Sequence, residues 1–289
     1  MTNATIEATP VGIPARVAAT EKQQKPSPRP RQGVRKRRFA IQGLGWISVA
    51  SVVLGLTVWE LVSRFIVDNK LFLVGPIDIV QRIGTMFANE DLMHDISVSG
   101  QEFGGGMLLS IVIGIPVGLM IALSPGIKAV LQPWISALYA TPTIALSPLF
   151  ILWFGLDPVG KIIVIALVGV FAVIVNTETG VRETPPDLVE MARIMGLKGF
   201  GLFAKVYIRS AFPFILTGIR LAIGKCIIGV VVAELFGAQA GLGLRIQEAQ
   251  LAFDMSGLFV CVIVLAVAGV VLTAIAQAIE NKLAPWRQA

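Results

Sequence analysis

Three ionisable side chains lie inside one long apolar run, and they are the residues most able to do chemistry there. Arg220 and Lys225 fall in the middle of the run 210–236, and Glu234 falls near its end. A charge in such surroundings is costly, so each of these groups needs either an ion-pair partner or a function. Arg220 and Glu234 are close to four helical turns apart and share a helix face, whereas Lys225 lies about half a turn from Glu234. The spacing therefore predicts that the three side chains do not enter one cavity.

Two roles compete for the cations of this run. In the functional role, a cation lines a substrate path and attracts an anion. Arg220 suits this role best, because its planar guanidinium can donate two hydrogen bonds to one oxyanion, and Lys225 is the second candidate. In the structural role, a cation pairs with a carboxylate, for which Glu178 is the candidate. Both roles remain open for Arg220, whereas a structural role is favoured for Glu234.

A second candidate set lies in the apolar run 129–153, which contains three prolines. Proline frees backbone carbonyls, and these are tolerated at membrane depth only where neighbouring helices or a wet cavity satisfy them. A plain kink is the commoner explanation. The alternative is that hydroxyl side chains between the prolines line a substrate path. The hydroxyl residues are Thr141, Thr143 and Ser147.

The chain has few residues that could support metal binding or catalysis. His94 is the single histidine, and Cys226 and Cys261 lie inside apolar runs, where cysteine is typically a small core residue. The segment 218–226 resembles a phosphate-binding loop in passing, but its spacing is one residue too long and no Ser or Thr follows Lys225. We therefore expect no catalytic residue, no metal and no cofactor, and any ATP hydrolysis must belong to another subunit.

The composition places these residues in a membrane protein. Of the 289 residues, 55% are hydrophobic and 15% charged, and the mean hydropathy is +0.79, whereas soluble domains are about a quarter charged. Six apolar stretches are near the length that crosses a hydrocarbon core of about 30 Å: 39–67, 96–123, 129–153, 161–179, 210–236 and 257–280. We expect an all-α polytopic membrane protein with six transmembrane helices. An ion-coupled secondary transporter would need carboxylates at mid-bilayer, and an intramembrane enzyme would need a catalytic constellation, so both are weaker hypotheses.

Charges outside the spans predict the orientation. Residues 1–38 carry nine Lys or Arg and two Asp or Glu without an apolar period, which is typical of a disordered tail. Acids dominate 68–95 and cations dominate 181–209, so the positive-inside rule puts the first segment outside and the second, with both termini, in the cytoplasm. Because the basic excess is confined to the tail, no nucleic-acid partner is expected. The predicted organisation is a basic tail, a first span with an external amphipathic segment, a core and a cytoplasmic C-terminus, at 1–38, 39–94, 95–280 and 281–289.

Three smaller features predict how the spans pack. The glycines at 104–106, 114 and 118 permit close approach of a neighbouring helix. Apolar residues from Ile79 to Phe87 recur at helical spacing after Pro76, which predicts a short amphipathic helix on the outer face. Glu102, near the outer end of its span, is expected at the membrane interface.

The cytoplasmic loop 181–209 is patterned and not a plain linker. Thr184 before Pro185 and Pro186 reads as an N-cap with prolines in the first helical turn. Apolar residues continue to Met195, and Gly196 provides a stop. A second helical stretch follows, with Phe200, Phe203 and Tyr207 on one side. Chance amphipathicity is one explanation, but exposed apolar residues on short helices beside a membrane predict a partner that covers them.

The same loop carries a family resemblance. Glu190-Met191-Ala192, Gly196 four residues after Ala192, and Val206-x-Ile208 resemble the EAA loop of ABC-importer permeases. Met191 replaces the central alanine, and Arg209 stands where the motif ends in proline. The resemblance implies that this loop docks on a cytoplasmic ATPase, with Glu190, Met191, Ala192 and Gly196 as its coupling residues.

The flanking sequence extends the likeness over about 95–280. Pro142-x4-Ser147-Pro148 continued by Leu149-Phe150-Ile151-Leu152-Trp153-Phe154-Gly155, then Pro213-x3-Leu216-x-Gly218, Ala233-Glu234 and Gly241-Leu242-Gly243, is similar to the nitrate/sulfonate/taurine branch of these permeases. The resemblance implies a type I importer permease of the bacterial inner membrane that moves a small anionic nutrient by alternating access. Its implied partners are an ATP-binding subunit pair, an extracytoplasmic binding protein, membrane lipid and a second permease copy, most economically an identical one.

Overall fold

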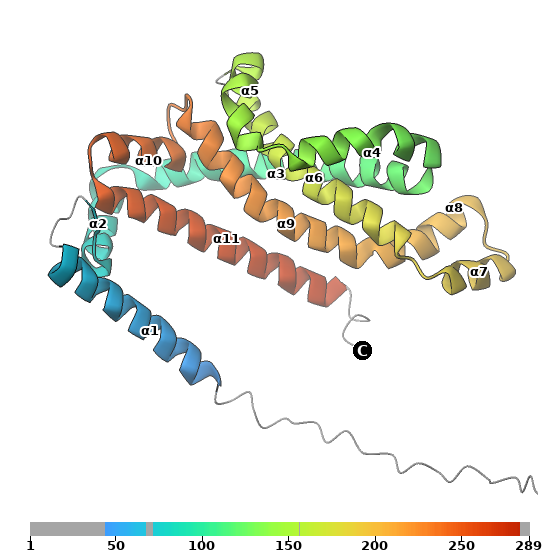
Figure 1. Cartoon of the computed structure of the whole chain (residues 1–289), viewed down its shortest axis with the longest axis horizontal. Coiled ribbons are helices and arrows are strands. Elements are labelled where there is room, and N and C mark those ends of the chain that lie inside the picture. The colour runs from blue at the N-terminus through green and yellow to red at the C-terminus, as the bar shows by residue number, and fades with distance from the viewer. Residues whose placement is uncertain (1–43, 68–71, 156, 284–289) are drawn as a thin grey trace, which may run out of the picture. The chain divides into compact units, whose positions relative to one another are not determined.

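The computed structural model describes residues 44–67, 72–155 and 157–283, and within these ranges every regular element is a helix (Figure 1). The chain divides into two compact units, 1–50 and 51–289. Of the first unit only residues 44–50 are described, so the predicted tail 1–38 lies outside the described residues. The elements are α1 (Leu44–Val62), η1 (Ser63–Val67), α2 (Pro76–Asn89), α3 (Leu92–Leu123), α4 (Pro125–Ala140), η2 (Thr143–Leu146), α5 (Ser147–Phe154), α6 (Pro158–Arg182), α7 (Pro186–Ile194), α8 (Gly199–Leu202), η3 (Phe203–Tyr207), α9 (Ile208–Leu235), α10 (Leu242–Leu251) and α11 (Met255–Leu283).

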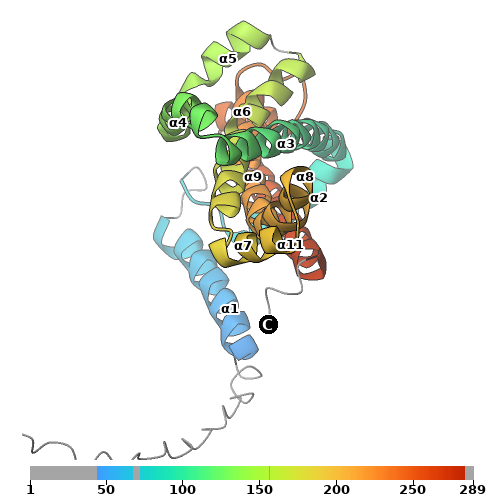
Figure 2. The ribbon, with the colours of Figure 1, turned by 90° about the vertical axis from the view of Figure 1, so that its right-hand side faces the viewer.

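The core of the second unit is built on α6, which packs against α3 and α9 along much of its length (Figures 1 and 2). The predicted role of the α3 glycines is confirmed for Gly105, Gly106, Gly114 and Gly118 and is wrong for Gly104. A Cβ added at Gly114 would lie 2.7 Å from Val173 Cβ, and one at Gly106 would lie 2.6 Å from Ile165 Cβ. Gly104, by contrast, faces open space. Close approach of α3 to α6 therefore depends on particular glycines of this stretch.

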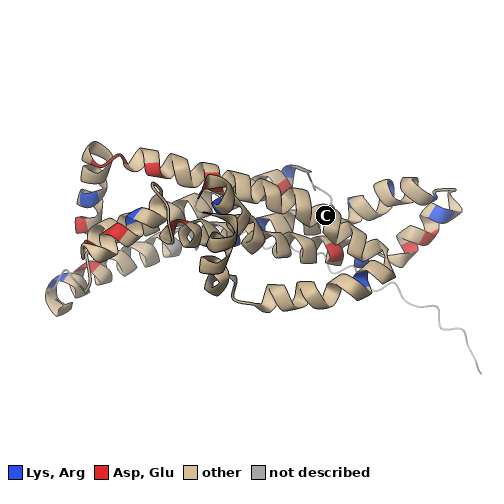
Figure 3. Cartoon of the chain, turned by 90° about the horizontal axis from the view of Figure 1, so that it is seen from above, with Lys and Arg blue, Asp and Glu red and all other residues tan. Residues whose placement is uncertain are grey.

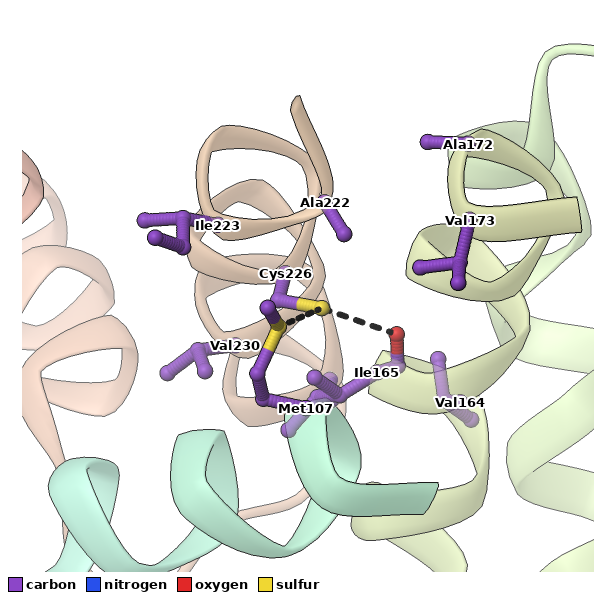
Figure 4. Close-up of a cluster of buried hydrophobic side chains, with 10 residues drawn as sticks. Met107, Val164, Ile165, Ala172, Val173, Ala222, Ile223, Cys226 and Val230 are labelled. Carbon is purple, nitrogen blue, oxygen red and sulfur yellow. Dashed lines mark hydrogen bonds between the residues drawn. The ribbon is translucent and has the colours of Figure 1, made fainter. Parts of the chain in front are cut away.

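The buried side chains at this contact form a compact apolar cluster (Figure 4). The Cys226 thiol of α9 lies in it, 3.9 Å from Met107 Sδ and 3.8 Å from the Ile165 carbonyl oxygen. Cys261 is likewise free and buried. Both cysteines are thus small core residues, as the sequence predicted.

Five described helices are long and apolar enough to cross a membrane, at 49–67, 92–123, 158–182, 199–235 and 255–282. The predicted span 129–153 is wrong as a single helix, because α4 ends at Ala140 and α5 begins at Ser147. Thr141 is extended, with ψ of 133°, as a residue before proline prefers. Pro142 lacks the N–H needed to continue α4, and Pro148 lies in the first turn of α5. Pro133, in the interior of α4, does not end the helix.

The amphipathic segment after the first span is helical, as predicted, and forms α2. Gly75 is its N-cap and Pro76 its first residue. Ile79 and Met86 are buried in a cluster with Val260 of α11, while Val80 on the other face is exposed. The apolar face of α2 is therefore covered by the protein itself.

Candidate functional site

Charged residues lie along the whole length of the second unit, including the end that carries α2 and α10 and the end that carries α7 (Figure 3). The α7 end holds the predicted coupling loop. There α6 ends at Arg182, α7 and α8 follow, and η3 leads into α9.

The start of α7 differs from the prediction. Its N-cap is Pro185, with ψ of 127°, and no side chain caps the helix. Thr184, expected to cap, is buried instead. The reason is that a residue before proline avoids the helical region, so Pro185 itself is held outside the helix by Pro186.

The end of α7 is a Schellman turn built on Gly196, which confirms the predicted stop. Gly196 has φ of +85° and donates to the Arg193 carbonyl at 3.0 Å, while Leu197 donates to the Ala192 carbonyl at 2.9 Å. These two bonds satisfy carbonyls that the helix end would leave open. The turn therefore depends on a residue that tolerates positive φ.

One face of α7 is apolar and exposed. Met191, Ile194 and Met195 are 58%, 80% and 81% exposed, and Leu188 continues the stripe by one turn. Ala192 is buried on the inner face, so the four predicted coupling residues do not share one surface. Glu190 is exposed and forms no ion pair or side-chain hydrogen bond with the described part of the chain. It borders a hollow of about 760 Å³ together with Arg182 and Arg193.

The aromatic residues predicted on one side of the next stretch divide by burial. The rings of Phe200 and Phe203 lie 6.1 Å apart, but Phe200 is 80% exposed while Phe203 and Tyr207 are half-buried. Phe203 and Tyr207 also bound a π-helical turn, η3, which was not predicted. Phe200 thus extends the exposed apolar surface of α7 onto α8.

Arg220, the cation favoured for anion binding, forms an ion pair with Glu280 of α11. The predicted alternative partner was wrong, because Glu178 pairs with Lys128 at 2.9 Å and with Arg182 at 3.5 Å. The Glu280 side chain is 6% exposed. Arg220 therefore offsets a buried negative charge between α9 and α11.

Lys225 faces a different neighbour. Its Nζ lies 5.0 Å from the centre of the Tyr139 ring on α4, a cation–π contact, and it has no carboxylate partner among the described residues. Thr141, two residues further along, donates its hydroxyl to the Ala137 carbonyl at 2.8 Å. Ser147 is fully buried, and the side chain of Thr143 lies outside the described part of the structure. Lys225 thus lies against the last turn of α4 through Tyr139, and Thr141 directly follows that turn.

Glu234 has a structural role, as favoured, at the α10 end. Its carboxylate accepts from the Ser99 hydroxyl at 2.7 Å and from the Gly243 N–H at 2.6 Å. A Cβ at Gly241 would overlap this carboxylate, and Gly241 also has φ of +127°. The glycines of the motif quoted above therefore form the cradle of the glutamate that precedes them.

A neighbouring cluster ties α10 to the start of α3. Asp95 accepts from the Gly241 N–H at 2.8 Å and from Arg245 Nε at 2.6 Å. The hydrogen bond that Arg245 donates to Asp95 raises the pKa of the Arg245 guanidinium, in opposition to its partial desolvation. Arg245 also donates to the Glu90 carbonyl. The turn between α9 and α10 is thus held by charge-assisted bonds.

Sequence reasoning missed the most buried ion pair in the described residues. Glu102 pairs with Lys161, with side chains 3% and 6% exposed, so Glu102 is enclosed by the protein, and its place at the membrane interface stays a prediction. Both residues interrupt or flank apolar runs, and that signal could have marked them as partners. A buried charge without a partner would be costly, so the ion pair explains why both Glu102 and Lys161 can be buried.

Residues 114–285 match the family described as binding-protein-dependent transport system inner membrane component, which is more than half of the chain. The chain belongs to this family. An ABC transporter permease protein of Brucella abortus is 32% identical over 248 residues, covering 86% of this chain and 98% of the relative. A Bacillus subtilis permease protein named for aliphatic sulfonates transport is 33% identical, covering 80% and 84%. A formylaminopyrimidine transport permease protein of Halalkalibacterium halodurans is 33% identical, covering 81% and 92%.

Among solved structures, an inward-facing MetNI methionine ABC transporter has a TM-score of 0.55 over 66% of this chain and 94% of that chain, at 18% identity, which shows the same fold. The chain is a multi-pass permease subunit of an ATP-driven importer in the inner membrane, a transport component and not an enzyme. As a member of this family it functions with separate ATP-binding subunits and a substrate-binding protein.

Proposed function

We propose that the segment 184–207 is the surface on which the ATP-binding subunits dock, and that Glu190 and Gly196 serve coupling and not substrate recognition. The observation that carries this proposal is the exposed apolar stripe of α7, flanked by a carboxylate that has no partner within the described chain. Apolar surface of this kind on a helix of nine residues is stabilised when a partner covers it. The competing reading is that the stripe lies on the membrane surface.

Met191→Asp discriminates between these readings. It places a charge at the centre of the stripe without touching the packed inner face, so the tagged permease should lose most of its ATP-binding subunit in a pull-down while its amount in the membrane is unchanged. Met191→Leu is the matched control, because it keeps the apolar volume and should retain the subunit. Full retention of the ATP-binding subunit by Met191→Asp would contradict the proposal and favour the membrane-surface reading.

We further propose that the α7 end, with both termini, faces the cytoplasm. The support is the cation excess of the loop 181–209 and the acid excess of 68–95. Because both native cysteines are buried, an impermeant maleimide should report introduced cysteines cleanly. In vesicles from cells without the ATP-binding subunit, which would otherwise cover α7, Ile194→Cys should label in inverted vesicles only. Val80→Cys on α2 should label in right-side-out vesicles only. The reverse pattern would overturn the orientation.

The substrate we propose is a small anion of the nitrate or sulfonate type, delivered by an extracytoplasmic binding protein. A relative named for aliphatic sulfonates supports it, but an equally similar relative carries the name of a formylaminopyrimidine. Thermal unfolding of the cognate binding protein separates the two, since a ligand stabilises the protein that binds it. Sulfonate, taurine and nitrate should be compared with formylaminopyrimidine. Stabilisation of the binding protein by formylaminopyrimidine alone would refute the proposal that the substrate is an anion.

For the path itself we propose Lys225, with Thr141, ahead of Arg220. The charge of Arg220 is offset by Glu280, whereas that of Lys225 faces only an aromatic ring among the described residues. Lys225→Gln should lower uptake with assembly intact. Arg220→Gln should lower assembly and uptake together. Adding Glu280→Gln as a second change should restore both. Normal uptake by Lys225→Gln would exclude that residue.

We also propose that two copies of this chain face one another, because each contributes one docking segment and the ATP-binding subunits of the family act as a pair. Two differently tagged copies expressed together should co-purify from membranes. Recovery of each tag only with a different permease would show a heterodimer instead.

A further inference from the structure

A second hollow at the α7 end, of about 720 Å³, lies between α6, the start of α7 and the beginning of α9. Its size is within the range of pockets that hold small molecules. It is separate from the hollow that Glu190 borders, with which it shares no lining residue. Its lining combines cations, small polar groups and apolar side chains, namely Asn176, Thr179, Pro185, Leu188, Lys205, Val206, Arg209, Ser210, Pro213, Phe214 and Thr217.

Lys205 and Arg209 give this hollow its charge. No Asp or Glu is among its described lining residues, and neither cation forms an ion pair within the described ranges of the chain. The C-terminus of α6 lies nearby, but a helix end carries only about half a unit of negative charge. The two cations therefore dominate, and the hollow favours an anion.

Three of the neighbouring polar side chains donate to backbone carbonyls of their own helices. Thr179 donates its hydroxyl to the Val175 carbonyl at 2.8 Å, and Thr217 donates to the Pro213 carbonyl at 3.0 Å. Asn176 likewise uses its amide N–H on a backbone carbonyl of its own helix. With these hydroxyls and this amide N–H used on backbone, the Lys205 ammonium and the Arg209 guanidinium are the charged donors of the hollow, with the Ser210 hydroxyl beside them.

The rest of the wall is apolar. Leu188, Val206, Pro213 and Phe214 line it, and Phe214 is 36% exposed. A fully hydrated inorganic ion would gain nothing from these surfaces, whereas an anion with an apolar body would bury that body against them. Arg209 stands where the loop motif of related permeases ends in proline, so one of the two cations is a departure of this chain from the motif.

We propose that this hollow binds a small amphiphilic anion, with an oxyanion group at Lys205 and Arg209 and an apolar body against Pro213 and Phe214. The site requires neither that the ligand be transported nor that the ATP-binding subunit be docked, so it goes beyond the proposed function. The hollow shares Pro185, Leu188, Lys205 and Val206 with the proposed docking segment. Because binding is measured on the permease alone, a failure of docking would leave that measurement unaffected.

The test uses the full chain in nanodiscs of neutral phosphatidylcholine and titration calorimetry with pentanesulfonate, methanesulfonate and inorganic sulfate. The wild type should bind pentanesulfonate most tightly. Lys205→Gln combined with Arg209→Gln should weaken that binding at least tenfold, and Lys205→Arg with Arg209→Lys should retain it within a few-fold. Lys198→Gln, a cation of the same loop outside the hollow, is the matched control and should change nothing.

Phe214→Ala separates the apolar contribution. It should weaken pentanesulfonate binding and leave methanesulfonate binding unchanged, with Phe214→Leu intermediate if the alanine variant is poorly folded. Undetectable pentanesulfonate binding, or equal binding by the double Gln variant, would overturn the proposal.

The same oxyanion chemistry exists in lipid headgroups. Nanodiscs with phosphatidylglycerol distinguish that source, because a free anion should compete with the lipid and bind more weakly there. Loss of phosphatidylglycerol retention in the double Gln variant, without pentanesulfonate binding in either lipid, would assign the hollow to a lipid and overturn the free-anion proposal.

Discussion

Gly196→Val is the perturbation that most directly tests the coupling turn. Gly196 has φ of +85°, and a Cβ there would meet nothing within 4 Å. The cost is therefore conformational and not steric: the left-handed region costs an L-residue about 1–2 kcal/mol, and a β-branched side chain is the least suited to it. Such a cost changes a local equilibrium by about 5- to 30-fold. The Schellman turn should open, α7 should lose its fixed direction, and uptake and ATPase retention should fall together.

A graded series at this position identifies the cause. Asn tolerates positive φ better than Ala, and Ala better than Val, so Gly196→Asn should retain most of the uptake, Gly196→Ala less and Gly196→Val least. Uptake, retention of the ATP-binding subunit and the amount of permease in the membrane are measured for each variant. Equal uptake across the series, or a fall that follows loss of the permease from the membrane, would refute the assignment of the turn to coupling.

The packed core makes two further predictions. Gly106→Ala should lower the thermal unfolding temperature in detergent, because overpacking against Ile165 costs about 1–3 kcal/mol. Gly104→Ala is the control and should not lower it, because Gly104 faces open space. Equal effects would show that the packing of α3 does not depend on the contact at Gly106. Lys161→Met should destabilise the folded permease by about 3–5 kcal/mol, because it leaves Glu102 as a buried charge without its partner. Glu102→Gln as a second change should restore much of the lost stability. No restoration would mean that Lys161 stabilises the protein through other contacts.

The parts of the fold that the sequence predicted correctly are those determined locally. The end of α7 follows from one glycine, and the helix from Pro76 follows from apolar spacing over about two and a half turns. The break at 141–146 was equally local, since Pro142 and Pro148 are six residues apart. It was misjudged because hydropathy alone gave 129–153 the length of a span.

The pairing of charges could not be predicted in the same way. Arg220 and Glu280 are sixty residues apart in the sequence, and which carboxylate reaches Arg220 depends on how α9 and α11 pack. The helical period correctly separated Lys225 from the face of Glu234, but period alone does not name a partner on another helix. The sequence likewise showed Glu234 and the glycines after it only as a motif. The hydrogen bond from the Gly243 N–H to the Glu234 carboxylate forms only because the chain turns back after α9.

The two charged ends of the second unit differ in how their charges are used. At the α10 end, Asp95, Glu234 and Arg245 are bound to one another's helices through side-chain and backbone hydrogen bonds. At the α7 end, Glu178 pairs with Lys128 and Arg182, but Glu190, Lys205 and Arg209 have no ion-pair partner within the described residues. Charges satisfied internally stabilise a fixed arrangement, whereas charges left in solvent bind well only when a partner or ligand supplies the opposite charge. This asymmetry is what a subunit needs if one end maintains its shape and the other exchanges contacts, and it is why the proposed docking and anion sites both lie at the α7 end.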